Sequence, residues 1–300
     1  EILIGLVGSE MCIRDRHLIA SAELAQLLTT YQGKPAIFRE EAPGDMDPGW
    51  ADGSQYARLV YGVDMQGDPE RKTSGTLSID VFCAAGSFNP EDLEPTVRSL
   101  IDGYFFSDTA QTMAAIWERT DGFQVETGKG SNINGVTLTF SLSAYPNQET
   151  GAPDPVQRLN SWCKDEYPDA KIIGLDALPN VWKPTNTAPA VYWNLQQIGP
   201  GRIPDSWACT WRTATLRGFV MAPGEIARNG LVRNMTDRLD ELSRLIFPDN
   251  SPLMFQQITA KINADPLKEG QITVLGEYGI TRKLPQRPTL NHIHMAHGKE

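Results

Sequence analysis

The same order of structural signals occurs twice in this chain. The first stretch spans residues 74–120 and the second spans residues 206–262. In each, a β-rich run leads into a loop with a proline suited to a helix start, and a long amphipathic helix follows. A polar break and a second short helix come next. We predict a duplicated unit. The alternative is one larger domain whose elements resemble each other by chance.

The first long helix has a clear start. Asn89 can cap it, Pro90 suits the first turn, and acidic residues follow near the positive end of the helix dipole. Apolar residues then recur at steps of three and four: Leu93, Val97, Leu100, Ile101, Tyr104 and Phe105. The second long helix begins near Pro223. Its apolar stripe consists of Leu231, Met235, Leu239, Leu242, Leu245 and Ile246.

A β-hairpin is predicted ahead of each long helix. The paired runs are residues 59–63 with 76–83 in the first copy, and 190–195 with 208–216 in the second. In residues 76–83 apolar and polar side chains alternate, which is typical of a half-buried antiparallel strand. Long loops join the paired runs. A closing strand ends each copy, near residues 136–143 and 272–276.

These patterns predict an α+β fold with two tandem similar modules, each an antiparallel sheet with helices packed on one face. Each module begins with a helix. The segment between them is rich in Pro, Gly and polar residues, which favours a linker. The predicted divisions are a first module at 17–146, a linker at 147–154, a second module at 155–284 and a flexible tail at 285–300.

The first sixteen residues, EILIGLVGSEMCIRDR, stand apart from the rest. They resemble the in-frame translation of a sequencing-library adapter, and residues 6–16 match its constant part. A secretory signal would place basic residues before the apolar run, whereas Arg14 and Arg16 follow it here. A natural strand or short helix is the alternative. We exclude residues 1–16 from the fold as an artefact.

Charge and cysteine usage narrow the class of protein. The chain has 37 acidic and 27 basic residues, a net charge of −10, which argues against a protein that coats nucleic acid. No apolar run approaches the length of a membrane span. Cys12 falls in the excluded segment. The remaining three, Cys83, Cys163 and Cys209, are widely spaced and odd in number, which favours reduced thiols over disulfides.

Catalytic side chains are scarce in the sequence. His17 borders the excluded segment, and the other histidines, His292, His294 and His297, crowd into the tail. A metal site there is the alternative to a solvated tail. TGKGSNING, residues 127–135, lacks the spacing of a phosphate loop and leads into a strand. The acidic residues at 40–47 fit a solvated loop better than a cation site. We predict no catalytic residue, no cofactor, no metal and no enzyme activity.

Tryptophans in loops are the better candidates for contacts with other proteins. Trp50 and Trp207 are therefore predicted interface residues, whereas the strand residues Trp193 and Trp211 are predicted to lie in the core. The long hairpin loops add three basic residues to the predicted interface: Arg71, Lys72 and Arg202.

The order of elements resembles that of tail-terminator and tail-completion proteins of long-tailed bacteriophages. In the first copy the likeness rests on PAIFREEAP, ARLVYGVD, SGTLSIDVFC and EDLEPTVRSLIDGYFF. PAVYWNLQ, WRTATLRGFVM and RNMTDRLDELSRLIF carry a more distant likeness in the second. The resemblance implies a structural virion protein that forms a ring on the tail tube and ends its polymerisation. It also implies a role in joining the tail to the head.

The resemblance implies further properties. The protein would lie in the virion, and in the host cytoplasm during assembly, with the tail tube and the head–tail connector proteins as partners. The family's rings are sixfold with one module per subunit, so three chains with two modules each would give pseudo-sixfold symmetry. We expect no membrane association and no specific nucleic-acid binding. The alternatives are a non-viral assembly adaptor and a small-molecule-processing α+β enzyme with a cleft between the modules.

Overall fold

A computed structural model describes residues 17–65, 73–84, 86, 89–107, 111–126, 132–148 and 151–282. The first module comprises α2 (Ala22–Leu27), β1 (Thr30–Tyr31), β2 (Lys34–Pro35), β3 (Ile37–Arg39), η1 (Ala51–Gly53), β4 (Arg58–Met65), β5 (Thr73–Ala84), α3 (Pro90–Ile101), β6 (Tyr104–Ser107), β7 (Gln111–Glu126) and β8 (Asn132–Pro146). The second comprises α4 (Pro155–Glu166), β9 (Lys171–Ile173), β10 (Val181–Trp182), β11 (Ala190–Pro200), β12 (Cys209–Met221), α5 (Glu225–Leu242), β13 (Arg244–Ile246), β14 (Pro252–Ala260) and β15 (Ile272–Thr281).

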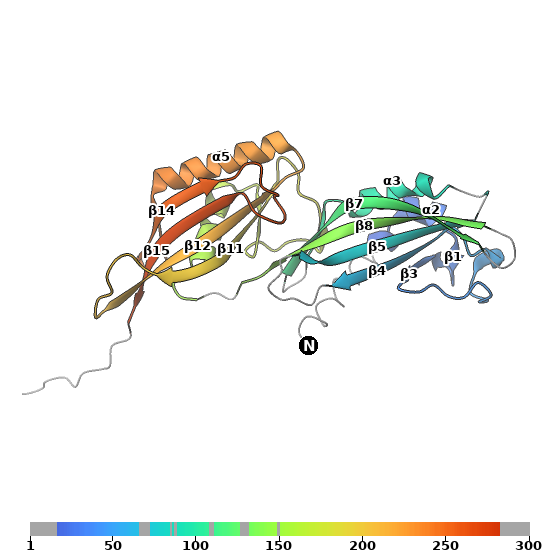
Figure 1. Cartoon of the computed structure of the whole chain (residues 1–300), viewed down its shortest axis with the longest axis horizontal. Helices are drawn as coiled ribbons and strands as arrows, with labels where there is room; N and C mark the ends of the chain where they lie inside the picture. The colour runs from blue at the N-terminus through green and yellow to red at the C-terminus, as the bar shows by residue number, and fades with distance from the viewer. Residues whose placement is uncertain are drawn as a thin grey trace, which may run out of the picture.

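Two large sheets follow one another along the long axis of the molecule (Figure 1). The first has the strand order β10-β6-β7-β8-β5-β4-β3, and the second has the order β13-β14-β15-β12-β11-β9. Without β10, the first order is matched strand for strand by the second. In both sheets a three-residue strand, β3 or β9, runs parallel to its neighbour, and the pairings among the other strands are antiparallel.

Finer details also recur in the two sheets. A β-bulge interrupts β7 between Trp117 and Arg119, and another interrupts β14 between Phe255 and Gln257. Both modules point the same way along the long axis, since β8 ends at the centre of the molecule and β15 ends at its outer extremity (Figure 1). The two modules are thus arranged head to tail.

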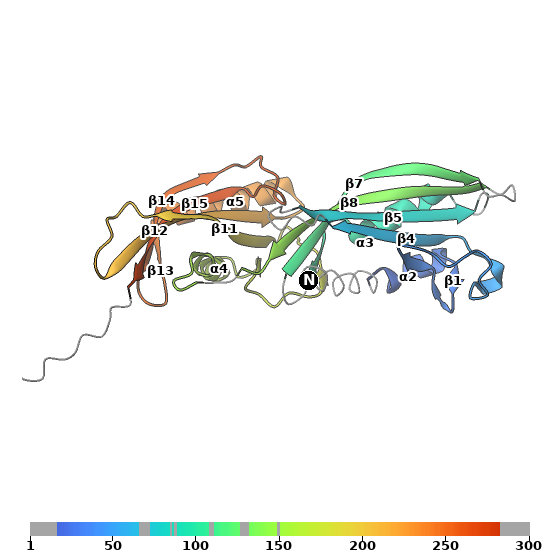
Figure 2. The ribbon, with the colours of Figure 1, turned by 60° about the horizontal axis from the view of Figure 1, so that its bottom comes forward.

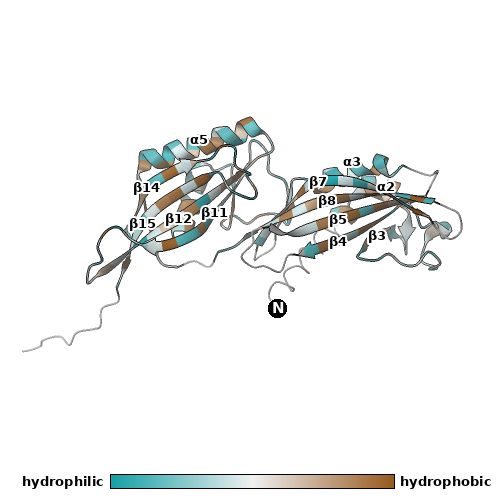
Figure 3. Cartoon of the chain, viewed as in Figure 1, coloured by the Kyte–Doolittle hydropathy of each residue, from teal (hydrophilic) through white to brown (hydrophobic). Residues whose placement is uncertain are grey.

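The core of each module brings buried strand residues together with residues of its helices. In β5 the alternate residues Leu77, Ile79, Val81 and Cys83 are at most 2% exposed, which confirms the predicted alternation and the core position of Cys83. They pack with Leu93, Val97 and Ile101 of α3. The second core joins α4 and α5 to β11, β12 and β15, with Trp193 and Leu239 fully buried. Apolar and polar residues are interspersed along α5 (Figure 3), and its buried residues are Val232, Met235 and Leu239.

The predicted α+β fold class was wrong. The described part of the chain is mostly β, with 45% strand and 22% helix, and its two sheets curl into half-barrels, as Figure 2 shows from a second direction. The segments predicted as second short helices are the strands β7 and β14. Helix-favouring residues such as Met113 and Ala114 are drawn into β7 because it pairs with β8 along its whole length. Tertiary pairing overrides the local preference.

The ends of the long helices also differ from the prediction. α3 ends at Ile101, so Tyr104 and Phe105 belong to β6, and Leu245 and Ile246 belong to β13. Asn89 occupies the N-cap position of α3, but its side chain makes no capping hydrogen bond. In α4, by contrast, Asp154 accepts hydrogen bonds from two backbone N–H groups of the first turn.

One strand of the second module crosses the boundary and joins the sheet of the first. β10 belongs to the second module in sequence, yet Val181 and Trp182 pair with β6 and form the outer edge of the first sheet. A third apolar cluster lies between the two sheets. Its buried members are Phe105, Ala114, Tyr145, Ile173, Ala190, Tyr192, Phe219 and Met221. We call this cluster the junction.

Candidate functional site

The predicted interface residue Trp50 lies inside its own loop. Its side chain is 6% exposed, its ring meets those of Tyr31 and Phe38 at centroid distances of 5.0 and 5.6 Å, and its Nε1 donates to the Gly44 carbonyl at 3.0 Å. These contacts occupy most of the ring. Arg71 and Lys72, predicted with it, lie outside the described residues.

Trp207 and Arg202 are exposed on the loop between β11 and β12. Trp207 is 74% exposed, and Ile198 and Ile203 of the same hairpin are 53% and 36% exposed. Hydrogen bonds hold this loop in place: the Asp205 carboxylate accepts from the Trp211 N–H at 2.9 Å and pairs with Arg282 at 3.0 Å. The hairpin therefore presents apolar side chains from an ordered backbone.

Exposed apolar side chains gather at the outer end of the second module. Besides the hairpin, Leu242 at the end of α5 and Ile246 in β13 are 44% and 43% exposed. All of these elements lie at the extremity where β15 ends (Figures 1 and 2). We call this group the second outer end: Ile198, Ile203, Trp207, Leu242 and Ile246. Such a cluster is typical of a surface that contacts another macromolecule.

The junction fixes the two modules to each other by stacking and hydrogen bonds. Phe105 stacks on Trp182 at a centroid distance of 4.8 Å, and Tyr145 meets Tyr192 edge to face at 5.2 Å. The hydroxyl of Tyr145 donates to the Leu267 carbonyl at 3.1 Å, and that of Tyr192 donates to the Pro146 carbonyl at 2.9 Å. These contacts bury the aromatic rings, and each tyrosine hydroxyl has a hydrogen-bond acceptor.

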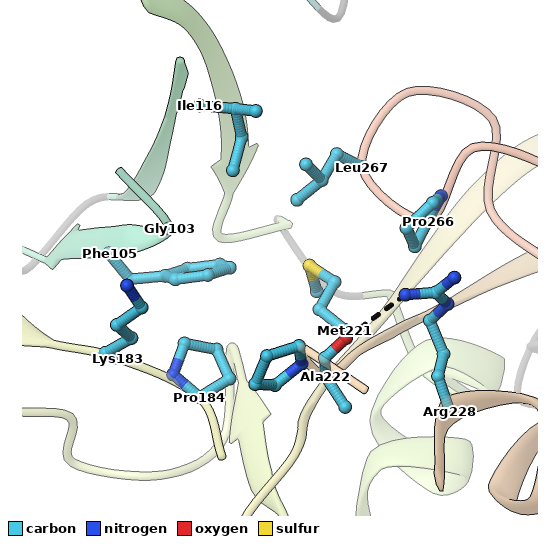
Figure 4. A pocket seen from close by; sticks show the side chains of 11 residues that line it. Gly103, Phe105, Ile116, Lys183, Pro184, Met221, Ala222, Arg228, Pro266 and Leu267 are labelled. Carbon is cyan, nitrogen blue, oxygen red and sulfur yellow. Dashed lines mark hydrogen bonds between the residues drawn. The ribbon is translucent and has the colours of Figure 1, made fainter. Parts of the chain in front are cut away.

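A pocket of about 210 Å³ opens beside the junction (Figure 4). Phe105, Met221 and Leu267 point into it, and prolines form part of its wall. Of its two charged side chains, Lys183 donates from Nζ to the Asp102 carbonyl at 2.6 Å. Arg228 donates to the carbonyl of Ala222, another lining residue, at 3.2 Å, and its buried Nε has no hydrogen-bond partner among the described residues. No Asp, Glu, His or Cys is among its described lining residues. The pocket offers apolar contact and little acid–base chemistry.

The two buried thiols, Cys83 and Cys163, are held in their neutral form. Burial raises the pKa of Cys163 to about 12, although the Trp193 Nε1–H, 3.1 Å from the sulfur, acts in the opposite direction. Burial, with Glu91 and Asp92 nearby, raises the pKa of Cys83 to about 11. A nucleophilic cysteine requires the opposite shift. In the described part of the chain, no group of three or more His, Cys, Asp and Glu side chains is placed to hold a metal ion.

Burial of Cys163 predicts a loss of stability at alkaline pH. Its folded pKa of about 12 exceeds the ordinary value of 9.0, so the unfolded chain loses this proton first and stability falls as pH rises above 9. At pH 10.5 Cys163 alone contributes about 2 kcal/mol to this loss relative to pH 8. Chemical denaturation at both pH values measures it. In Cys163→Ser the loss should shrink by about that amount, and an unchanged loss would contradict the assignment.

Comparison with protein-family models, with curated proteins and with solved structures gave no match. None of the described helices is long and apolar enough to cross a membrane. Residues 1–16, the histidines of the predicted tail and the glycines of the 127–131 loop lie outside the described residues. The site must therefore be judged from the geometry of the two modules.

Proposed function

We propose that this chain is a ring-forming structural protein of a phage tail, of the terminator or completion type. The supporting observation is the head-to-tail order of two modules with the same strand order, fixed to each other by the apolar junction. Such an arrangement leaves two unlike ends, and unlike ends make heterologous contacts that close into a ring when the rotation between neighbours allows it.

In this proposal three chains form a ring with pseudo-sixfold symmetry. The ring binds the tail tube on one side and head–tail connector proteins on the other, in the virion and earlier in the host cytoplasm. The exposed hairpin with Trp207 and Arg202 supplies part of these contacts. A non-viral assembly adaptor would use the same geometry with other partners.

The pocket beside the junction gives little support to the alternative of an enzyme with a cleft between the modules. Its volume of about 210 Å³ is below the roughly 300–1,000 Å³ of most ligand pockets. Its described lining residues include no carboxylate, imidazole, thiol or phenol, and Lys183 donates to the Asp102 carbonyl. The groups that most often act as general bases near neutral pH are therefore absent from the described wall of this pocket.

Sedimentation velocity and negative-stain electron microscopy of the full chain test the proposal. We expect a species of three times the 33.1 kDa chain mass at micromolar concentration, seen as closed rings with a central opening. A chain that stays monomeric up to about 50 µM, a concentration at which even weak assembly contacts are populated, would contradict it.

A further inference from the structure

The edge of the first sheet is covered where the matching edge of the second is open. β10 lies on the outer side of β6. The matching strand of the second sheet is β13, and among the described residues no strand lies on its outer side. An open strand edge presents backbone N–H and C=O groups that another chain can use. At this edge the Ile246 carbonyl accepts a hydrogen bond from Arg158 Nε at 2.7 Å, which an incoming strand would replace.

Ile246 of β13 occupies the place of Phe105 in β6. Each directly precedes an aromatic residue buried in its own module, Phe106 in the first and Phe247 in the second. Phe105 is 2% exposed because Trp182 covers it, whereas Ile246 is 43% exposed. The second module therefore carries an uncovered copy of the surface that forms the first half of the junction.

The first module carries a matching copy of the other half of the junction. In the second module Tyr192 pairs with Phe219 across β11 and β12. In the first, Arg58 pairs with Phe82 near the corresponding ends of β4 and β5, and the guanidinium lies 5.4 Å from the ring centroid. Phe82 directly precedes Cys83 and Phe219 directly precedes Val220, and Cys83 and Val220 are each buried in the core of their own module.

In the order of elements along the chain, the loop at residues 40–57 of the first module is the counterpart of β10 and its flanking residues in the second. It lies between β3 and β4, as β10 lies between β9 and β11. Asp45 of this loop pairs with Arg58 at 3.1 Å, which holds the loop beside the Arg58–Phe82 pair, and its neighbour Met46 is 84% exposed. Met46 is thus presented at the outer end of the first module.

The positions of the exposed apolar side chains agree with this match between the two outer ends and the two halves of the junction. Ten large hydrophobic side chains are exposed in the described part of the chain, and seven lie at the two outer ends. Met46 and Val125 lie at the first outer end, and the five residues of the second outer end supply the rest. Among the described residues, exposed apolar surface is therefore concentrated at the two outer ends.

We propose that a second copy of this chain docks head to tail and repeats the junction between copies. Its 40–57 loop adds to the open edge of β13, as β10 adds to β6, and its Arg58–Phe82 surface packs on Ile246. The inference rests on the proposed assembly and names the surfaces that make it. Pairing along β13 supplies backbone hydrogen bonds, and Met46 and Ile246 supply apolar contact.

Three charge substitutions in the full chain test the contact. Ile246→Arg and Met46→Arg each place a charge in the proposed interface, and each should weaken association at least about 30-fold in sedimentation velocity. Ile226→Arg on α5 is the matched control, since Ile226 is 92% exposed and away from both outer ends. It should leave association within about twofold of the unchanged chain. Circular dichroism checks that all three variants fold alike.

Mixing the two interface variants gives a stricter test. Each retains one intact outer end, so an equimolar mixture should form a two-chain species and nothing larger. If the unchanged chain assembles but this mixture stays monomeric, or if Ile246→Arg assembles normally, the proposed contact is overturned while a ring made by another surface stands. If Ile246→Arg blocks the growth of open chains that never close, the contact stands and the terminator proposal fails. A monomeric unchanged chain overturns both.

Discussion

Replacement of Trp193 by alanine is expected to lower the free energy of unfolding of the second module by about 3–5 kcal/mol. Trp193 is fully buried, and its Nε1 donates to Cys163. Its ring lies over Gly218, where a Cβ atom would come within 2.7 Å of it. Removal of the indole leaves a cavity that the rigid sheet cannot close. Urea denaturation followed by circular dichroism measures the loss.

Trp207→Ala is the matched control within the same module. Trp207 is 74% exposed, so its removal should change the stability of the isolated chain by less than about 0.5 kcal/mol. Equal losses for the two variants would contradict the assignment of Trp193 to the core. The measurement belongs at low protein concentration, because Trp207 lies at the second outer end and its loss also weakens the proposed assembly.

Tyr145→Ala is expected to uncouple the two modules. The ring is 2% exposed and contacts Phe105, Tyr192 and Phe219, and its hydroxyl is bonded to Leu267 of the second module. The substitution removes about 3–4 kcal/mol of junction packing. Calorimetry should then show two separate unfolding transitions, where the unchanged chain shows one.

Tyr145→Phe separates packing from hydrogen bonding at the junction. It keeps the ring contacts and removes only the bond to the Leu267 carbonyl, so it should cost about 1 kcal/mol and leave a single transition. If Tyr145→Ala also unfolds in one transition at an unchanged temperature, the junction does not couple the modules. Hydrogen exchange of β6 and β9, which flank the junction, gives an independent readout.

Hydrophobic periodicity predicted correctly the elements whose buried face is set by side chains a few positions apart. The alternation in residues 76–83 and the stripe of α3 are set by side chains a few positions apart, and both face the core as expected. β7 and β14 were missed because their pairing is non-local. Met113, Ala114 and Ala115 have no strand preference of their own, and only the neighbouring β6 and β8 draw this run into the sheet.

The junction was also missed, although a signal for it was present. Core residues of β8 such as Leu138 and Phe140 lie on one track, and the other track carries small polar residues such as Ser141 and Ser143. Tyr145 follows on this polar track at the end of the strand. A single large aromatic in such a position indicates a second packing surface. Which surface it meets depends on residues more than forty positions away and cannot be read from the strand itself.

The position of β10 has a consequence for folding during synthesis. All the strands of the first sheet except β10 are complete once residue 146 has left the ribosome, but Trp182 emerges 36 residues later. In that interval the β6 edge and the ring of Phe105 have no cover from the nascent chain. Uncovered edges of this kind promote mispairing between neighbouring polypeptides. Ribosomes that translate one message in close succession therefore place several partly folded chains with the same exposed β6 edge near one another. A chaperone bound to that edge would prevent mispairing until β10 is synthesised.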